Sequence, residues 1–65
     1  MYHPKQEVNI WYTDSYGREV SHITTWKDFK STAIILLEKY LDYNVTMYYT
    51  VNNETFQLDY YNTLL

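Results

Sequence analysis

The 65-residue sequence contains no cysteine, one proline and one glycine. Without cysteine no disulfide can brace the chain, and its two histidines are poor material for a structural zinc site, so we expect no metal and no other cofactor. A chain of this length buries only about 60% of the surface that its unfolded form exposes. Pairing with a second copy, or docking on a partner, would add the missing burial. We therefore expect one small domain that either pairs with a second copy or docks on a partner.

Long apolar runs and an excess of basic residues are also absent. No segment approaches the roughly 18 apolar residues of a transmembrane helix, and residues 1–7 lack the apolar stretch of a signal peptide. We therefore expect no membrane contact and a cytoplasmic location. Eight acids face five bases, for a formal net charge of −3. A protein that binds duplex DNA carries a basic surface, so nucleic-acid binding is not expected.

Motifs of catalysis are missing as well. The sequence has no cysteine nucleophile, no glycine-rich phosphate loop and no H-E-x-x-H motif. Asp14, Ser15 and His22 form a hydrolytic triad only on paper, because no oxyanion-hole residues accompany them and so small a chain cannot build a closed pocket. We expect a protein that is not an enzyme. His22 is expected to be solvated or hydrogen-bonded rather than a metal ligand.

The sequence does have clear strand periodicity. Residues 1–6 are expected to form a flexible tail, and residues 7–65 a single domain. Within residues 7–13, Val8, Ile10 and Tyr12 alternate with a second set of side chains, as in a β-strand. Residues 19–24 alternate in the same way. The segment around Gly17 has turn chemistry, so the two strands are expected to form a hairpin.

A helix is predicted from Thr25 to about Leu41. Thr25 and Asp28 have the spacing of a capping box, and apolar residues follow at intervals of three and four. Lys39 near the end suits the negative end of the helix dipole. Ile35 falls outside the main apolar stripe, so the apolar arc is wide. A wide arc indicates two packing surfaces, one for the protein's own sheet and one for a second body.

Residues 45–50 and 55–61 alternate again and predict two further strands. The order β-β-α-β-β favours an α+β fold, with one antiparallel sheet and a single helix packed on one face. The other face of the sheet is then uncovered, and the strand phases place Trp11, Tyr48 and Tyr61 on it. Nine of the residues are tyrosines, whose rings and hydroxyls suit half-exposed surfaces. The second face is therefore predicted to be an interface.

The first two-thirds of the chain resemble a known family. The motifs that carry this resemblance are Val8-Asn9-Ile10, Asp14, Gly17-Arg18-Glu19 and Asp28-Phe29 at the start of a helix. They are similar to the small early protein of Bacillus podophages that inhibits the uracil-DNA glycosylase of the host. The resemblance implies a homodimer in the host cytoplasm, with an apolar pocket between paired helices for the leucine that the glycosylase wedges into DNA. Acidic side chains on the surface of the inhibitor would occupy the positions that DNA phosphates take in the groove of the glycosylase.

Carried over residue by residue, the resemblance makes Phe29 the pocket phenylalanine, with Asp28 and Glu19 as acids. The family has a tyrosine one helical turn after the phenylalanine, where this chain has Ala33. Trp26 or Tyr40 is expected to supply that ring.

The predicted partner-binding residues either are acids or lie in the predicted helix. They are Glu19, Trp26, Asp28, Phe29, Ala33, Leu37 and Tyr40. The leading hypothesis is a DNA mimic that blocks uracil-DNA glycosylase. Two alternatives stay open, namely another acidic phage antagonist (anti-CRISPR or anti-restriction) and a small structural dimerisation module.

Overall fold

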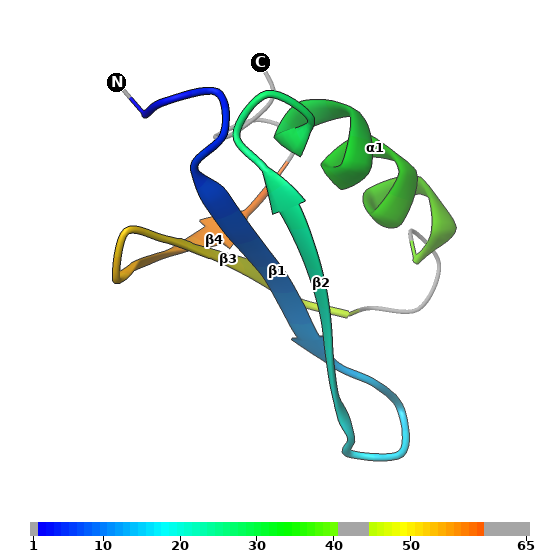
Figure 1. The fold of residues 1–65 in the computed structure, drawn as a ribbon. Coiled ribbons are helices and arrows are strands. Elements are labelled where there is room, and N and C mark those ends of the chain that lie inside the picture. The colour runs from blue at the N-terminus through cyan, green and yellow to red at the C-terminus, as the bar shows by residue number, and fades with distance from the viewer. Residues whose placement is uncertain (1, 41–44, 60–65) are drawn as a thin grey trace.

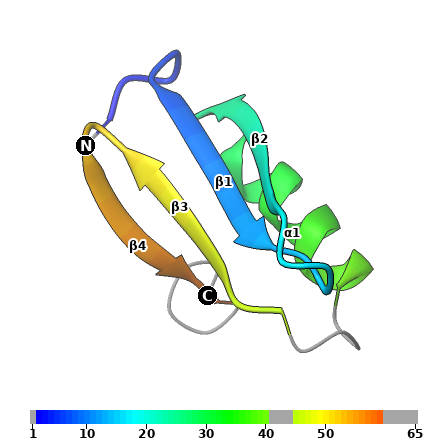
Figure 2. The same cartoon turned by 90° about the horizontal axis from the view of Figure 1, so that it is seen from below.

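The computed structural model describes residues 2–40 and 45–59. These residues form one antiparallel sheet with strand order β2-β1-β3-β4 and a single helix on one side of it (Figures 1 and 2). The elements in chain order are β1 (Glu7–Thr13), β2 (Glu19–Thr25), α1 (Phe29–Lys39), β3 (Met47–Val51) and β4 (Glu54–Leu58). The predicted α+β fold and the predicted order of elements are confirmed. No helix in the described part of the chain has the length and apolar character needed to cross a bilayer.

The two tight turns follow from local chemistry. In the β1–β2 loop, Asp14 Oδ1 accepts the backbone N–H groups of Tyr16 and Arg18, each at 2.9 Å, and Gly17 has φ of +80°. The β3–β4 turn has positive φ at both central residues, Asn52 (52°) and Asn53 (67°). Asparagine tolerates this conformation, and paired positive φ values match the twist of a two-residue hairpin.

The start of the helix differs from the prediction. Thr25 is the last residue of β2, and α1 begins at Phe29 with Asp28 as its N-cap and no side-chain capping hydrogen bond. The Thr25 hydroxyl instead donates to the Asp28 carboxylate at 3.3 Å. The capping-box prediction is therefore wrong.

The N-terminal segment explains this difference. The backbone N–H of Trp26 donates to the carbonyl of Gln6 at 2.8 Å, and that of Lys27 donates to Pro4 at 3.0 Å. These bonds hold the residues after Thr25 in a turn, so the N-cap of the helix is Asp28, three residues later than the local pattern indicates. They also tie part of the expected tail, residues 1–6, to the domain.

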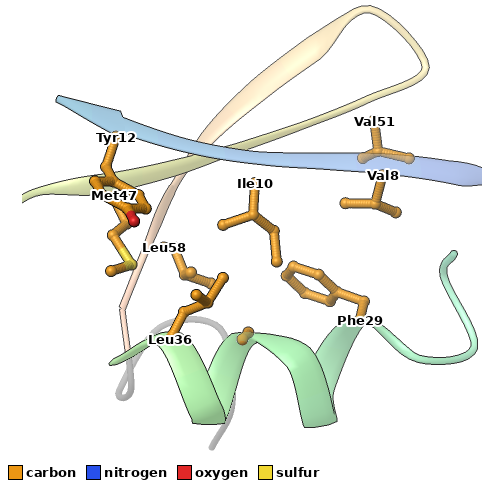
Figure 3. Packing of buried hydrophobic residues seen from close by; sticks show 9 residues of the cluster. Val8, Ile10, Tyr12, Phe29, Leu36, Met47, Val51 and Leu58 are labelled. Atoms are coloured by element: carbon orange, nitrogen blue, oxygen red, sulfur yellow. The ribbon is translucent and has the colours of Figure 1, made fainter. Parts of the chain in front are cut away.

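The core lies between the helix and the sheet. Val8, Ile10 and Tyr12 point from β1 towards α1, and the core holds no buried polar residue among those described (Figure 3). Nine buried side chains form it, namely Val8, Ile10, Tyr12, Phe29, Ala33, Leu36, Met47, Val51 and Leu58. Because β1 residues alternate in direction, Asn9 and Trp11 lie on the opposite side of the sheet.

Candidate partner-binding surfaces

The two central residues of the predicted pocket lie inside the protein's own core. Phe29 is 2% exposed and Ala33 is fully buried. The Phe29 ring stacks on Trp26 with centroids 5.4 Å apart, and it contacts the Tyr49 ring at 4.6 Å. The single chain therefore fills this space itself. The expectation that Phe29 and Ala33 line an accessible pocket is not met, because the helical stripe that carries them covers the chain's own sheet.

Phe29 belongs to a continuous row of aromatic rings on the helix side of the sheet. Tyr2 meets Trp26 edge-on at 4.8 Å, and beyond Phe29 the Tyr49 ring stacks on Phe56 at 5.2 Å. Phe56 is 40% exposed, so the row reaches the surface at β4. Sequence reasoning missed the outer members of this row because they come from the N-terminal segment and the second hairpin. The row joins four separate segments and stabilises the fold.

Leu37 and Tyr40, the other predicted residues of the helix region, pack half-buried against the core. The hydroxyls of Tyr40 and Tyr12 share a hydrogen bond of 2.7 Å. Burial, and next the hydrogen bond to Tyr40, raise the pKa of Tyr12 to about 12. Tyr40 therefore fastens the end of the helix to β1.

The two predicted acids are exposed but far apart. Glu19 begins β2, and Asp28 follows the end of that strand by three residues. A strand of seven residues spans about 20 Å, so Glu19 and Asp28 flank opposite ends of β2. They cannot line one small pocket.

The sheet face that points away from α1 has a different composition, and we call it the open face. Trp11 and Tyr48 are cross-strand partners, and their rings stack there with centroids 4.8 Å apart and an interplanar angle of 25°. Trp11 Nε1–H donates to the Thr50 hydroxyl at 3.0 Å. Ile23 on β2 is 61% exposed. The predicted placement of Trp11 and Tyr48 agrees with the structure, and Tyr61 lies outside the described residues.

The charge of the open face has one sign. Glu7 and Glu19 stand at the two ends of this face, since they pair with Thr25 and Thr13 in the same register that pairs Trp11 with Ser21. None of the four strands contains a lysine or an arginine. The basic residues lie in the N-terminal segment, the β1–β2 loop, the turn before the helix and the helix itself, as Lys5, Arg18, Lys27, Lys30 and Lys39.

A polar hollow of about 290 Å³ lies at one corner of the sheet. It is formed where β1 begins, β3 ends and the β3–β4 turn follows, and its lining residues are Gln6, Glu7, Asn9, Thr50, Asn52 and Asn53. The Asn9 side-chain oxygen is shielded from solvent and has no hydrogen-bond partner. The only sequence signal for this hollow is Asn9 itself, because asparagine is disfavoured inside a strand.

The described residues contain no group of three or more histidine, aspartate or glutamate side chains that could hold a metal ion. No family model, curated protein or solved structure matches the chain. The resemblance to the podophage inhibitors therefore stays a prediction from the residues quoted for it.

Proposed function

We propose that this protein is an acidic DNA mimic that binds a host DNA-processing enzyme, uracil-DNA glycosylase first among them, and blocks its DNA-binding groove. The observation that carries this proposal is the open face, where glutamates flank a stacked tryptophan–tyrosine pair and the strands bear no cation. A groove that binds DNA is basic because it neutralises phosphates. Complementary charge speeds the encounter, and the aromatic pair supplies apolar contact.

This proposal moves the contact surface from the start of the helix to the open face. Trp11, Tyr48 and Ile23 offer apolar area that the chain itself leaves uncovered, whereas Phe29 and Ala33 do not. Glu19 keeps its proposed role as a substitute for a phosphate, and Glu7 joins it. Asp28 lies beside Lys27 and Lys30, which would oppose a basic groove.

The same proposal includes a homodimer. Ile35 is 65% and Ile34 is 37% exposed on the outer surface of α1, and a helix of the opposite copy would cover them. This arrangement agrees with the paired helices that the family resemblance implies. It leaves both open faces free and doubles the negative charge.

A glycosylase activity assay tests the proposal. The wild-type protein is expected to abolish uracil excision at a modest molar excess. Replacing Glu7 and Glu19 by glutamine removes two exposed charges, each worth up to about 1 kcal/mol, so inhibition should weaken by about three- to thirtyfold at low salt. The matched control changes Asp28→Asn and Glu54→Gln, which remove the same charge on the helix side of the sheet. Full glycosylase activity at a large excess of wild-type protein would overturn the proposal.

The alternative target classes share the electrostatic argument, since any enzyme with a basic DNA groove meets the same open face. Nuclease assays with restriction and CRISPR effector enzymes, run beside the glycosylase assay, decide among them. Inhibition of a nuclease alone identifies an anti-restriction or anti-CRISPR protein. A dimer that inhibits none of these enzymes is a structural module, and Ile35→Glu should convert that dimer to monomers on a sizing column.

A further inference from the structure

The polar hollow has the size and place of a socket for one side chain. Its volume of about 290 Å³ lies just below the range of roughly 300–1,000 Å³ that holds drug-sized ligands. It adjoins the open face, because Asn9 and Trp11 follow each other on the same side of β1. Thr50 lines the hollow and accepts the Trp11 indole N–H, so one lining residue links the hollow to the aromatic pair of the open face.

The lining of this hollow is polar and carries one charge. Glu7 contributes a carboxylate, and the amide groups of Gln6, Asn9, Asn52 and Asn53 each contribute an acceptor oxygen beside their N–H donors. Glu7 makes no ion pair within the described residues, and the Arg18–Asp14 pair lies in the distant β1–β2 loop. Lys5 is the nearest lysine in the sequence, and it makes no ion pair with Glu7 in the described part of the chain.

Asn9 adds an acceptor oxygen that has no hydrogen-bond donor. Its Oδ1 atom is shielded and unpaired, which costs about 1–3 kcal/mol for a buried acceptor. The χ2 torsion of asparagine is soft, so the side-chain amide of Asn9 can turn to meet a donor placed in the hollow. A metal ion does not fit this lining, because Ca²⁺ takes six to eight oxygen ligands at about 2.4 Å and usually several carboxylates, and only one carboxylate is present.

We propose that the hollow binds the guanidinium group of an arginine from the partner, and this inference rests on the proposed function. A guanidinium has five N–H donors and no acceptor, which complements the Glu7 carboxylate and the amide oxygens of the lining. Its planar fork pairs with a carboxylate through two parallel bonds. A lysine ammonium lacks this fork. Arginine is frequent in grooves that bind phosphates, so the socket deepens the mimicry by holding a residue that would otherwise contact DNA.

An NMR titration of the ¹⁵N-labelled full chain tests this inference without any glycosylase. The probes are N-acetyl-arginine amide and its neutral analogue, N-acetyl-citrulline amide, both taken into the tens of millimolar range. The arginine probe should shift the amide resonances of Asn9, Thr50 and Asn52, and the citrulline probe should not. Glu7→Gln should reduce the affinity for the arginine probe by about tenfold, because the charge-assisted bonds are lost. Glu54→Gln, which lies outside the hollow, should leave that affinity unchanged.

Three outcomes would overturn the inference. They are equal shifts with citrulline amide, shifts spread over the whole sheet, and equal or tighter binding of N-acetyl-lysine amide. The result is also separable from the fate of the proposed function. A protein that inhibits the glycosylase but does not bind the arginine probe retains the inhibitor proposal and loses the socket. A protein that binds the probe but inhibits no enzyme retains the socket and loses the inhibitor proposal.

Discussion

Replacing Phe29 by alanine should remove most of the stability of the protein. The Phe29 ring is 2% exposed and lies between Trp26 and Tyr49, with centroid distances of 5.4 and 4.6 Å. Burying a phenylalanine contributes about 1.5–3 kcal/mol, and each ring pair adds about 0.5–1.5 kcal/mol. Truncation of a buried phenylalanine accordingly costs about 3–5 kcal/mol. A domain of this size has a total free energy of unfolding of roughly 3–10 kcal/mol.

Urea unfolding, followed by tryptophan fluorescence and far-ultraviolet circular dichroism, measures this effect. Trp26 stacks on the ring that is removed, so its fluorescence reports the loss directly. Phe29→Leu keeps most of the apolar volume and should cost about 1–2 kcal/mol, chiefly through the lost ring pairs. Lys30→Ala is the control in the same helix. Because Lys30 is exposed, this change should alter the free energy of unfolding by no more than about 0.5 kcal/mol.

A free energy of unfolding for Phe29→Ala within about 1 kcal/mol of wild type would refute the assignment of Phe29 to the core. That result would restore the accessible pocket expected from the family resemblance. Phe29→Leu then separates folding from binding in the glycosylase assay. A folded Phe29→Leu variant that inhibits fully supports the open face, and a folded variant without inhibition supports the helix start as the contact surface.

The remaining predictions concern the β1–β2 loop and the hydroxyl pair of Tyr12 and Tyr40. The hydrogen bond from the backbone N–H of Arg18, with further hydrogen bonds, holds the pKa of Asp14 below its usual 3.8. The stability that this carboxylate contributes is therefore full above pH 3.8. It is lost as the pH falls through the lower pKa of the folded state. Asp14→Ala should flatten this acid limb in a plot of urea midpoint against pH. The pKa of Tyr12 is raised from 10.0 to about 12, so its contribution is full below pH 10 and lost between pH 10 and 12. Tyr12→Phe should remove this alkaline loss, measured by the same midpoints. Gly17 has φ of +80° with no atom near an added Cβ, so Gly17→Ala should cost about 1 kcal/mol from the backbone alone and lower Tm by about 4–8 °C.

The strands were predictable because each has one buried side, which imposes a period of two on the sequence. Val8, Ile10 and Tyr12 reveal the phase of β1, and that phase also places Trp11 on the open face. The start of the helix was not predictable from Thr25 and Asp28. Carbonyl groups of the N-terminal segment bind the turn before the helix, and such tertiary hydrogen bonds leave no trace in a local capping pattern.

The candidate site was harder to predict than the fold. A helical stripe shows that Phe29 and Ala33 are covered, but it does not show whether the chain or a partner covers them. The strand phases could predict which acids lie on the open face. Glu7 and Glu19 alternate in step with Trp11 in the paired register, so their side chains lie on the same side of the sheet. The hollow depends on contacts between β1 and β3, as in the Trp11–Thr50 bond across 39 residues. The sequence contains no local signal for such a register.

The separation of charge between the two sides of the sheet decides which side can meet a basic groove. Three of the five basic residues, Lys27, Lys30 and Lys39, lie in or just before α1, on the helix side, together with the acids Asp28, Glu38 and Glu54. These charges offset one another, so the helix side offers a basic groove no net attraction. A contact through the open face meets Glu7 and Glu19 first, and the sheet keeps the lysines of α1 behind it. Salt should therefore weaken association through the open face, since screening reduces an attraction there. Association through the helix side, where acids and lysines offset one another, should depend little on salt, so the size of the salt dependence identifies the face in contact.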